Sequence, residues 1–192
     1  MCFEFGVGMV LVVAAVGISG SGKTTTLEYL ISRFSEKGWR VGAVKHIHHI
    51  DFSIDKAGTN TWRFAQAGAG VVIAVSPQEI DVIKKIKQDV QDFDSVQRLF
   101  QGENLDIVFV EGFHGLVASR RDVIKIVTAK DQIDLKNTLQ LIKQPIAAIS
   151  GLVAQSYTEP FFETIPVIGV PVEGDRLVLL IEEAQQKQSQ QS

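Results

Sequence analysis

Apolar residues along this chain fall into short runs separated by polar or glycine-rich stretches. Runs made mostly of valine, isoleucine and other small apolar residues occupy 10–16, 71–76, 106–111, 123–128 and 146–150. Such runs are typical of strands buried on both faces of a parallel sheet. Between them, residues 24–37 and 135–143 place apolar side chains at helical spacing. The alternation predicts an α/β fold in which helices flank a mainly parallel sheet.

Weaker patterns fill the rest of the chain. Short strands are predicted at 40–45 and, from a loose alternation, at 80–86, and short helices at 59–67 and 93–100. Thr59 is the predicted N-cap of the first of these helices. Prolines 160, 166 and 171 divide the later chain into short pieces, and the glutamine- and serine-rich residues 185–192 predict a disordered tail.

The strongest motif lies between the first predicted strand and the first predicted helix. Residues 17–24, Gly-Ile-Ser-Gly-Ser-Gly-Lys-Thr, match the pattern G-x-x-x-x-G-K-[ST] at every fixed position. In this setting the glycines let the backbone turn tightly and direct N–H groups toward phosphate oxygens, while the helix N-terminus adds partial positive charge. The motif predicts a nucleoside triphosphate site in a P-loop NTPase fold of three layers.

The residues of this phosphate loop, 17–24, have separate predicted roles. Lys23 reaches the β and γ phosphates, and Thr24 places its hydroxyl on Mg²⁺. The other predicted nucleotide contacts in the loop and the first helical turn are Gly17, Ser19, Gly20, Ser21, Gly22 and Thr25.

A second candidate for the metal site is an acid on the strand predicted at 106–111. This strand carries an acid at each end, Asp106 and Glu111, which lie roughly 16 Å apart at the usual rise per residue. Because ligands gather at the carboxyl ends of parallel strands, Glu111 is the predicted metal and catalytic residue. Gly112 then gives the backbone room to pass close to the γ phosphate.

Composition narrows the class of protein. With 192 residues, 45% of them hydrophobic, the chain is long enough for one α/β domain, predicted over residues 1–184. A net charge of −3 without a large basic block argues against nucleic acid as the main partner. The single cysteine, Cys2, excludes an internal disulfide and a cysteine-based zinc site.

The apolar N-terminus does not have the pattern of a targeting segment. The first twenty residues contain Glu4 and no lysine or arginine, and they lead directly into the phosphate loop. The loop also interrupts the apolar run before it reaches the roughly 20 residues that span a bilayer. Residues 1–8, before Met9, are interpreted as an extension without a role in the fold. We therefore predict a cytoplasmic protein without membrane association.

Five stretches stand out as a set. They are the phosphate loop, Lys45-His46-Ile47-His48-His49 with Asp51 and Asp55 behind it, Gly-Thr-Asn-Thr-Trp-Arg at 58–63, Ala-Gly-Ala at 67–69, and Glu111-Gly112-Phe113. Together they resemble the MobB family, molybdopterin-guanine dinucleotide biosynthesis protein B, over roughly the first two thirds of the chain.

This resemblance implies a homodimeric GTP-binding protein with weak, Mg²⁺-dependent GTPase activity. Its implied role is to assist the guanylyltransferase that attaches GMP to the molybdopterin cofactor. Two other functional classes use the same loop and stay open. One is a small-molecule kinase in which the histidine stretch forms an acceptor pocket, and the other is an adaptor that binds a nucleotide without hydrolysing it.

The histidine stretch has more than one interpretation. His46, His48 and His49 are favoured as contacts to a phosphate or a pterin phosphate, with metal ligands and solvated loop residues as alternatives. Asp51 is a candidate for holding Mg²⁺ through water and Asp55 for orienting an attacking water, and either can instead cap a turn.

Two further residues each have a functional and a structural interpretation. Arg63 suits a phosphate contact through its planar guanidinium, but a surface salt bridge explains it equally well. Thr-Ala-Lys-Asp at 128–131 resembles a guanine-recognition loop, with its lysine displaced by one position. Asp131 is therefore either a guanine contact or the N-cap of the helix that follows.

Overall fold

The computed structural model describes residues 10–49, 51–86 and 90–189. These residues form two compact units. The first contains the described residues up to His46 together with those from Asp92 onward, and the second contains the described residues between Ile47 and Gln91. That residues 1–184 form a single domain stays a prediction. The proposed extension at 1–8 lies outside the described residues.

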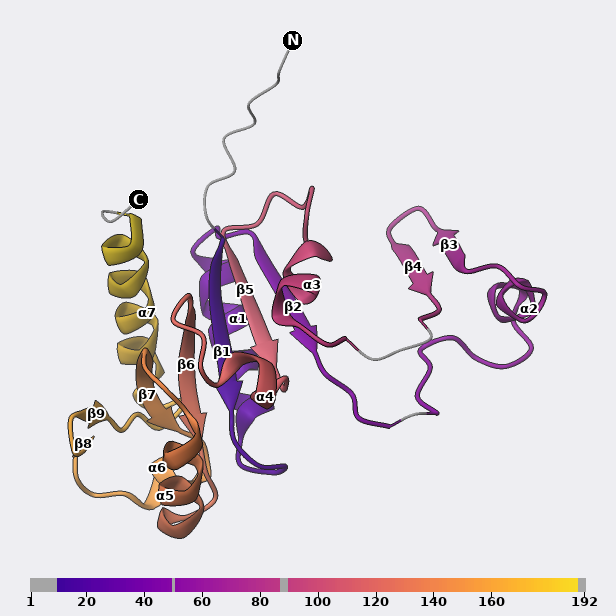
Figure 1. The fold of residues 1–192 in the computed structure, drawn as a ribbon. Helices are drawn as coiled ribbons and strands as arrows, with labels where there is room; N and C mark the ends of the chain where they lie inside the picture. Colours follow the sequence, from indigo (N-terminus) through magenta and orange to yellow (C-terminus); the bar gives the residue numbers. More distant parts are fainter. Residues whose placement is uncertain (1–9, 50, 87–89, 190–192) are drawn as a thin grey trace. The chain divides into compact units, whose positions relative to one another are not determined.

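A parallel five-stranded sheet forms the centre of the first unit (Figure 1). Its order is β2-β5-β1-β6-β7. The strands are β1 Leu11–Val16, β2 Val41–Lys45, β5 Ile107–Glu111, β6 Val123–Thr128 and β7 Ile146–Ser150. All six residues of β1 are buried because strands lie on both sides of it and helices cover both faces. The predicted parallel sheet is confirmed.

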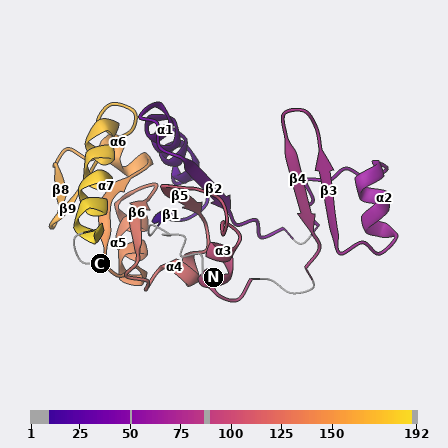
Figure 2. The ribbon, with the colours of Figure 1, turned by 90° about the horizontal axis from the view of Figure 1, so that it is seen from above.

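Helices cover the two faces of this sheet, which gives the predicted three layers. In Figure 2, helices α1 Lys23–Glu36 and α7 Gly174–Ser189 lie on one side. The short helices α3 Phe93–Arg98 and α4 His114–Val117, together with α5 Gln132–Leu141, lie on the other. No helix in the described ranges has both the length and the apolar character needed to cross a membrane.

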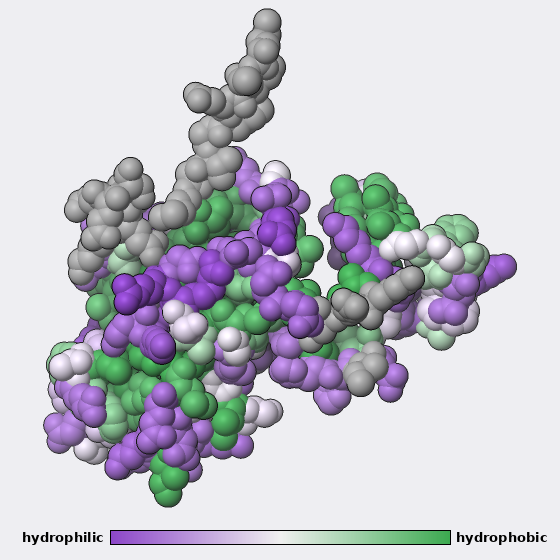
Figure 3. Space-filling view, viewed as in Figure 1, coloured by the Kyte–Doolittle hydropathy of each residue, from purple (hydrophilic) through white to green (hydrophobic). Residues whose placement is uncertain are grey.

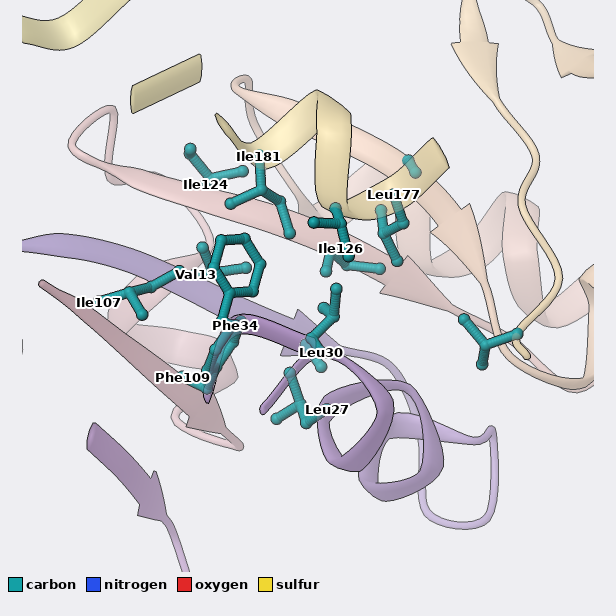
Figure 4. Packing of buried hydrophobic residues seen from close by; sticks show 14 of the residues in the cluster. Val13, Leu27, Leu30, Phe34, Ile107, Phe109, Ile124, Ile126, Leu177 and Ile181 are labelled. Carbon is teal, nitrogen blue, oxygen red and sulfur yellow. The ribbon is translucent and has the colours of Figure 1, made fainter. Parts of the chain in front are cut away.

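The hydrophobic core between the sheet and α1 and α7 holds the phosphate loop in place. Leu30 and Phe34 of α1 are fully buried against Phe109 of β5 and against Leu177 and Ile181 of α7 (Figure 4). Burying each such side chain contributes about 1.5–3 kcal/mol. The start of α1, where the loop ends, is thus fixed by packing along the whole helix.

The end of the chain differs from the prediction. Residues 185–189, expected to begin a disordered tail, belong to α7, so the tail prediction is wrong up to Ser189, while 190–192 lie outside the described residues. The helix persists because its apolar stripe packs on the sheet, a long-range contact that composition does not reveal. Short elements precede it: α6 Leu152–Ser156, β8 Phe161–Phe162 and β9 Ile165–Pro166.

The second unit is a helix packed on a two-stranded hairpin. Helix α2 Asn60–Gln66 is capped by Thr59, as predicted, and is followed by the antiparallel strands β3 Val71–Val75 and β4 Ile80–Lys84. One face of the hairpin is apolar and exposed, as the green residues over β3 and β4 in Figure 3 show. We call this face, formed by Val71, Ile73, Val75, Ile80 and Val82, the hairpin face.

Candidate functional site

The phosphate loop follows β1 at the carboxyl edge of the sheet and leads directly into α1. Its glycines adopt positive φ angles, 73° at Gly20 and 100° at Gly22. A Cβ on Gly17 would overlap the carbonyl oxygen of Thr128, and one on Gly22 would lie 2.9 Å from the Cα of Gly151. The loop therefore runs so close to the ends of β6 and β7 that only glycine fits there.

Hydrogen bonds from buried hydroxyl groups hold the phosphate loop in place. The hydroxyls of Ser21 and Thr128 are hydrogen-bonded at 2.7 Å, and Thr26 Oγ1 donates to the carbonyl of Gly22 at 2.9 Å. Ser21 is fully buried, so its side chain belongs to the framework of the loop. Such a framework keeps the backbone of the loop in one conformation before any ligand arrives.

The ammonium of Lys23 folds back over the loop that it terminates. It donates to the carbonyl of Gly17 at 3.0 Å and to that of Ile18 at 2.7 Å. Burial lowers the pKa of Lys23 from its usual value, and nearby Lys45 and Lys130 add to that shift. The side chain thus spans the cradle in which the sequence motif places phosphate groups.

Thr24 and Glu111 meet beside this cradle. Thr24 Oγ1 donates to Glu111 Oε2 at 3.0 Å, while Lys45 Nζ lies 3.1 Å from Glu111 Oε1. Asp106 is at the other end of its strand, where the Arg40 guanidinium holds its pKa at about 2. The structure therefore brings Glu111, and not Asp106, to the phosphate loop.

The residues at this position suit Mg²⁺. A threonine hydroxyl and a carboxylate are hard oxygen donors, and Mg²⁺ typically takes one or two such protein ligands while keeping waters and substrate phosphates. Among the described residues, no group of three or more histidine, cysteine or acidic side chains is arranged to hold a metal by itself. A metal here would therefore depend on the nucleotide for part of its coordination.

Behind Glu111 the backbone turns against the end of β2. Gly112 has a φ of 94°, and a Cβ on it would lie 2.8 Å from the Cβ of His46. The His46 ring stacks on Phe113, with centroids 4.4 Å apart and planes 11° from parallel. His46 thus lies next to the acidic strand end in the first unit.

The other residues of the predicted site lie in the second unit: His48, His49, Asp51, Asp55 and Arg63. Asp55 Oδ1 accepts hydrogen bonds from Thr59 at 2.8 Å and from Thr61 at 2.9 Å, so it ties the start of α2 to the preceding turn. This is the structural alternative considered for Asp55. Contact of these residues with a nucleotide or metal stays a prediction.

Asp131 has the capping role that was one of its two interpretations. Its Oδ1 accepts from the backbone N–H groups of Ile133 and Asp134, both at 2.9 Å, at the start of α5. Its neighbour Lys130 extends over the phosphate loop, with Cε 3.3 Å from the position of a Cβ on Gly20. A guanine contact by Asp131 stays a prediction.

Three residues of the site had no individual role assigned from the sequence. Lys45 pairs with Glu111, Lys130 covers Gly20, and Thr128 supports Ser21. Lys45 ends a predicted strand and begins the histidine stretch, and Lys130 belongs to the 128–131 stretch that resembles a guanine-recognition loop, so both lay in motifs that the sequence already marked. Thr128 gave a weaker signal as a polar residue closing an apolar run.

Comparison with known proteins agrees with this geometry. The model of the family MobB, molybdopterin guanine dinucleotide synthesis protein B, matches residues 12–150. A molybdopterin-guanine dinucleotide biosynthesis adapter protein of Haemophilus influenzae is 37% identical over 97 residues, which cover 50% of this chain and about half, 53%, of that protein. The protein of the same name from Escherichia coli is 32% identical over 144 residues, covering 74% of this chain and 79% of that protein.

A solved structure shows the same fold. The crystal structure of Bacillus subtilis MobB superposes with a TM-score of 0.67 at 24% identity, covering 88% of this chain and 96% of that one. With the family model extending over most of the chain and the phosphate loop, strand order and acidic strand end in place, this chain belongs to the MobB family.

Proposed function

We propose that this chain is a cytoplasmic GTP-binding protein that hydrolyses GTP slowly in the presence of Mg²⁺ and acts as an adapter in molybdopterin-guanine dinucleotide biosynthesis. The observation that carries this proposal is the 3.0 Å hydrogen bond between Thr24 and Glu111 beside the phosphate loop. It joins the metal-binding hydroxyl of the motif to the acid at the strand end, which is the arrangement expected of a site for a nucleotide and Mg²⁺.

Different residues of the site bind the phosphates and the metal. The loop backbone and Lys23 hold the phosphates, and Thr24 with Glu111 holds the metal. GTP supplies the phosphoanhydride bond, and Mg²⁺ supplies the positive charge that neutralises its phosphates. Since Lys23 is already bonded to the loop carbonyls of Gly17 and Ile18, phosphate binding exchanges these partners for phosphate oxygens. Catalysis by such a site consists mainly of positioning and charge stabilisation.

The names of the relatives support the adapter role. Both curated relatives described above are called adapter proteins of molybdopterin-guanine dinucleotide biosynthesis. The expected partners are therefore the molybdopterin cofactor and its guanylyltransferase. His48 and His49, both exposed at the start of the second unit, are the candidates for contacting a pterin phosphate.

The proposal includes a homodimer formed through the hairpin face. That face has five β-branched apolar side chains, each at least 53% exposed, and its one charged residue in the two strands, Lys84, lies at one end, across from Val71. An isolated two-stranded hairpin is only marginally stable in water. In a dimer with two-fold symmetry the same face of both copies meets, so pairing of two hairpin faces would cover the apolar surface of both.

One experiment separates the functional classes. Purified protein is titrated with GTP and ATP in the presence of Mg²⁺, and phosphate release is followed with and without molybdopterin. We expect tighter binding of GTP and slow release of inorganic phosphate. Phosphate appearing on a small acceptor would favour a kinase, and binding without turnover would favour a non-hydrolysing adaptor. Absence of nucleotide binding would refute the proposal.

The dimer is tested separately by sedimentation. Ile73→Lys places a charge at the centre of the hairpin face, and we expect it to convert dimers to monomers. Val172→Lys is the matched control, because Val172 is an apolar residue that is 93% exposed and belongs to the first unit, not to the hairpin. A wild-type chain that stays monomeric at high concentration contradicts the proposed dimer.

A further inference from the structure

Lys45 occupies a position in the site to which no role has been assigned. It is the last residue of β2 and lies level with Glu111 in the parallel pairing of β2 with β5. Its ammonium lies 3.1 Å from Glu111 Oε1, while Thr24 Oγ1 donates to Glu111 Oε2. A single carboxylate thus joins the predicted metal-binding hydroxyl to a lysine from a different strand.

The surroundings of Lys45 carry an excess of positive charge. Lys23, Lys45 and Lys130 lie close enough for the last two to lower the pKa of Lys23, after the larger effect of burial. Glu111 and Asp134 oppose this shift, but the Asp134 carboxylate already accepts from the backbone N–H of Lys130 at the start of α5. Three cations beside two carboxylates favour a polyanionic ligand.

The order of strands decides which part of such a ligand faces Lys45. The phosphate loop follows β1, Glu111 ends the neighbouring β5, and Lys45 ends β2 on the far side of β5. In this motif the loop lysine and threonine serve the β and γ phosphates and the metal. In this strand order, the terminal phosphate of a nucleotide held by the loop would be the part nearest Glu111 and the end of β2.

We propose that Lys45 contacts the terminal phosphate of the bound nucleotide and so makes the site prefer a triphosphate over a diphosphate. This assignment rests on the proposed nucleotide-binding function. With a triphosphate bound, Lys45 would exchange Glu111 for the terminal phosphate, and Glu111 together with Thr24 would be available to hold the metal. A diphosphate leaves Lys45 paired with Glu111, as in the structure described here.

The exposure of the two groups fits this exchange of partners. The Lys45 side chain is 56% exposed, whereas that of Glu111 is 15% exposed. Because water reaches the Lys45 end of this ion pair, its attraction to Glu111 is screened. Lys45 can therefore leave Glu111 at small cost, while the terminal phosphate offers a stronger, doubly charged partner.

Lys45 lies one residue before the end of the N-terminal part of the first unit, so it is close in sequence to the second unit. His46, the next residue, is the last residue of the first unit, and its ring stacks on Phe113 two residues after Glu111. The backbone N–H of His46 also donates to the carbonyl of Glu111 at 2.8 Å. The residue that follows Lys45 is thus tied to the strand end that carries Glu111.

The test is nucleotide selectivity measured by binding. Dissociation constants for GTP, a non-hydrolysable GTP analogue and GDP are determined with Mg²⁺ for wild type, Lys45→Ala, Lys45→Gln and Lys143→Ala. Lys143 is an exposed lysine before β7, at the opposite edge of the sheet, and serves as the matched control. Circular dichroism and thermal unfolding establish whether each variant is folded. If Lys45→Ala is unstable, Lys45→Gln takes its place in the test, because glutamine keeps most of the aliphatic part of the lysine side chain.

We expect Lys45→Ala and Lys45→Gln to weaken GTP and its analogue about tenfold or more, as loss of a hydrogen bond between charged groups implies, while GDP affinity changes less than about twofold. Lys143→Ala should match wild type. Equal weakening of GTP and GDP, or no weakening of either, would overturn the assignment of Lys45. A wild-type chain that binds neither nucleotide would instead refute the proposed function on which the assignment rests.

Discussion

The ring of His46 stacks on the ring of Phe113, with centroids 4.4 Å apart. This contact places the end of β2 directly against the turn that follows Glu111, and Gly112 lies between the two with a φ of 94°. Phe113 itself has a φ of 55°, which is uncommon for a residue other than glycine. The turn after β5 is therefore held in an unusual conformation next to the predicted metal site, where such conformations are often found.

Gly112→Ala should destabilise the protein. The added Cβ would lie 2.8 Å from the His46 Cβ and would stand at a strained backbone position, so we expect a loss of about 1–3 kcal/mol in the free energy of unfolding. Urea unfolding measures this loss. Gly115→Ala, in α4 with open space around its Cβ position, is the control and should leave stability unchanged or slightly higher.

Lys23→Ala should abolish nucleotide binding and leave the fold intact. The Lys23 ammonium contacts two loop carbonyls, and none of its partners belongs to the hydrophobic core. Isothermal titration with GTP should show no measurable heat of binding, while the circular dichroism spectrum stays that of wild type. A collapsed spectrum would show that the lysine is needed for folding and would contradict this prediction.

Glu111→Gln should reduce GTP turnover far more than Asp106→Asn. Glutamine preserves the size of the side chain and removes only the charge that would hold the metal, so nucleotide binding should persist while hydrolysis falls by about tenfold or more. Single-turnover phosphate release measures the difference. If Asp106→Asn stops turnover and Glu111→Gln does not, the active edge has been assigned to the wrong end of β5.

Asp106 should instead affect stability, in a pH-dependent way. Arg40 lowers its pKa from 3.8 to about 2, so the ionised form is favoured in the folded state. Its contribution is fully present above pH 3.8 and is lost as the pH falls through about 2. Unfolding of wild type and Asp106→Asn should therefore differ at pH 6 and converge toward pH 2. A constant difference across this range would exclude the Arg40 pair as its cause.

Local patterns in the sequence were sufficient for several features. All but one of the runs of small apolar residues became strands of the parallel sheet, because a strand buried on both faces needs no polar residue. The prediction of a buried strand at 71–76 was wrong, since this run forms β3 of the largely exposed antiparallel hairpin. The spacing of glycines, Lys23 and Thr24 predicted a phosphate loop because the backbone conformation that it requires is set by those few residues. Glu111 was preferred over Asp106 because the carboxyl ends of parallel strands meet at one edge.

The tertiary structure alone decided which residues surround the loop. Lys45 meets Glu111 because β2 lies beside β5, and Thr128 supports Ser21 because β6 lies beside β1. These strand neighbours are far apart in sequence, and no local pattern states their order. The same reason explains α7, where composition predicted a disordered tail but packing of Leu177 and Ile181 on the sheet stabilises a helix to Ser189. Short sequence motifs therefore predicted which residues bind phosphate or metal, whereas the contacts of each residue depended on long-range packing.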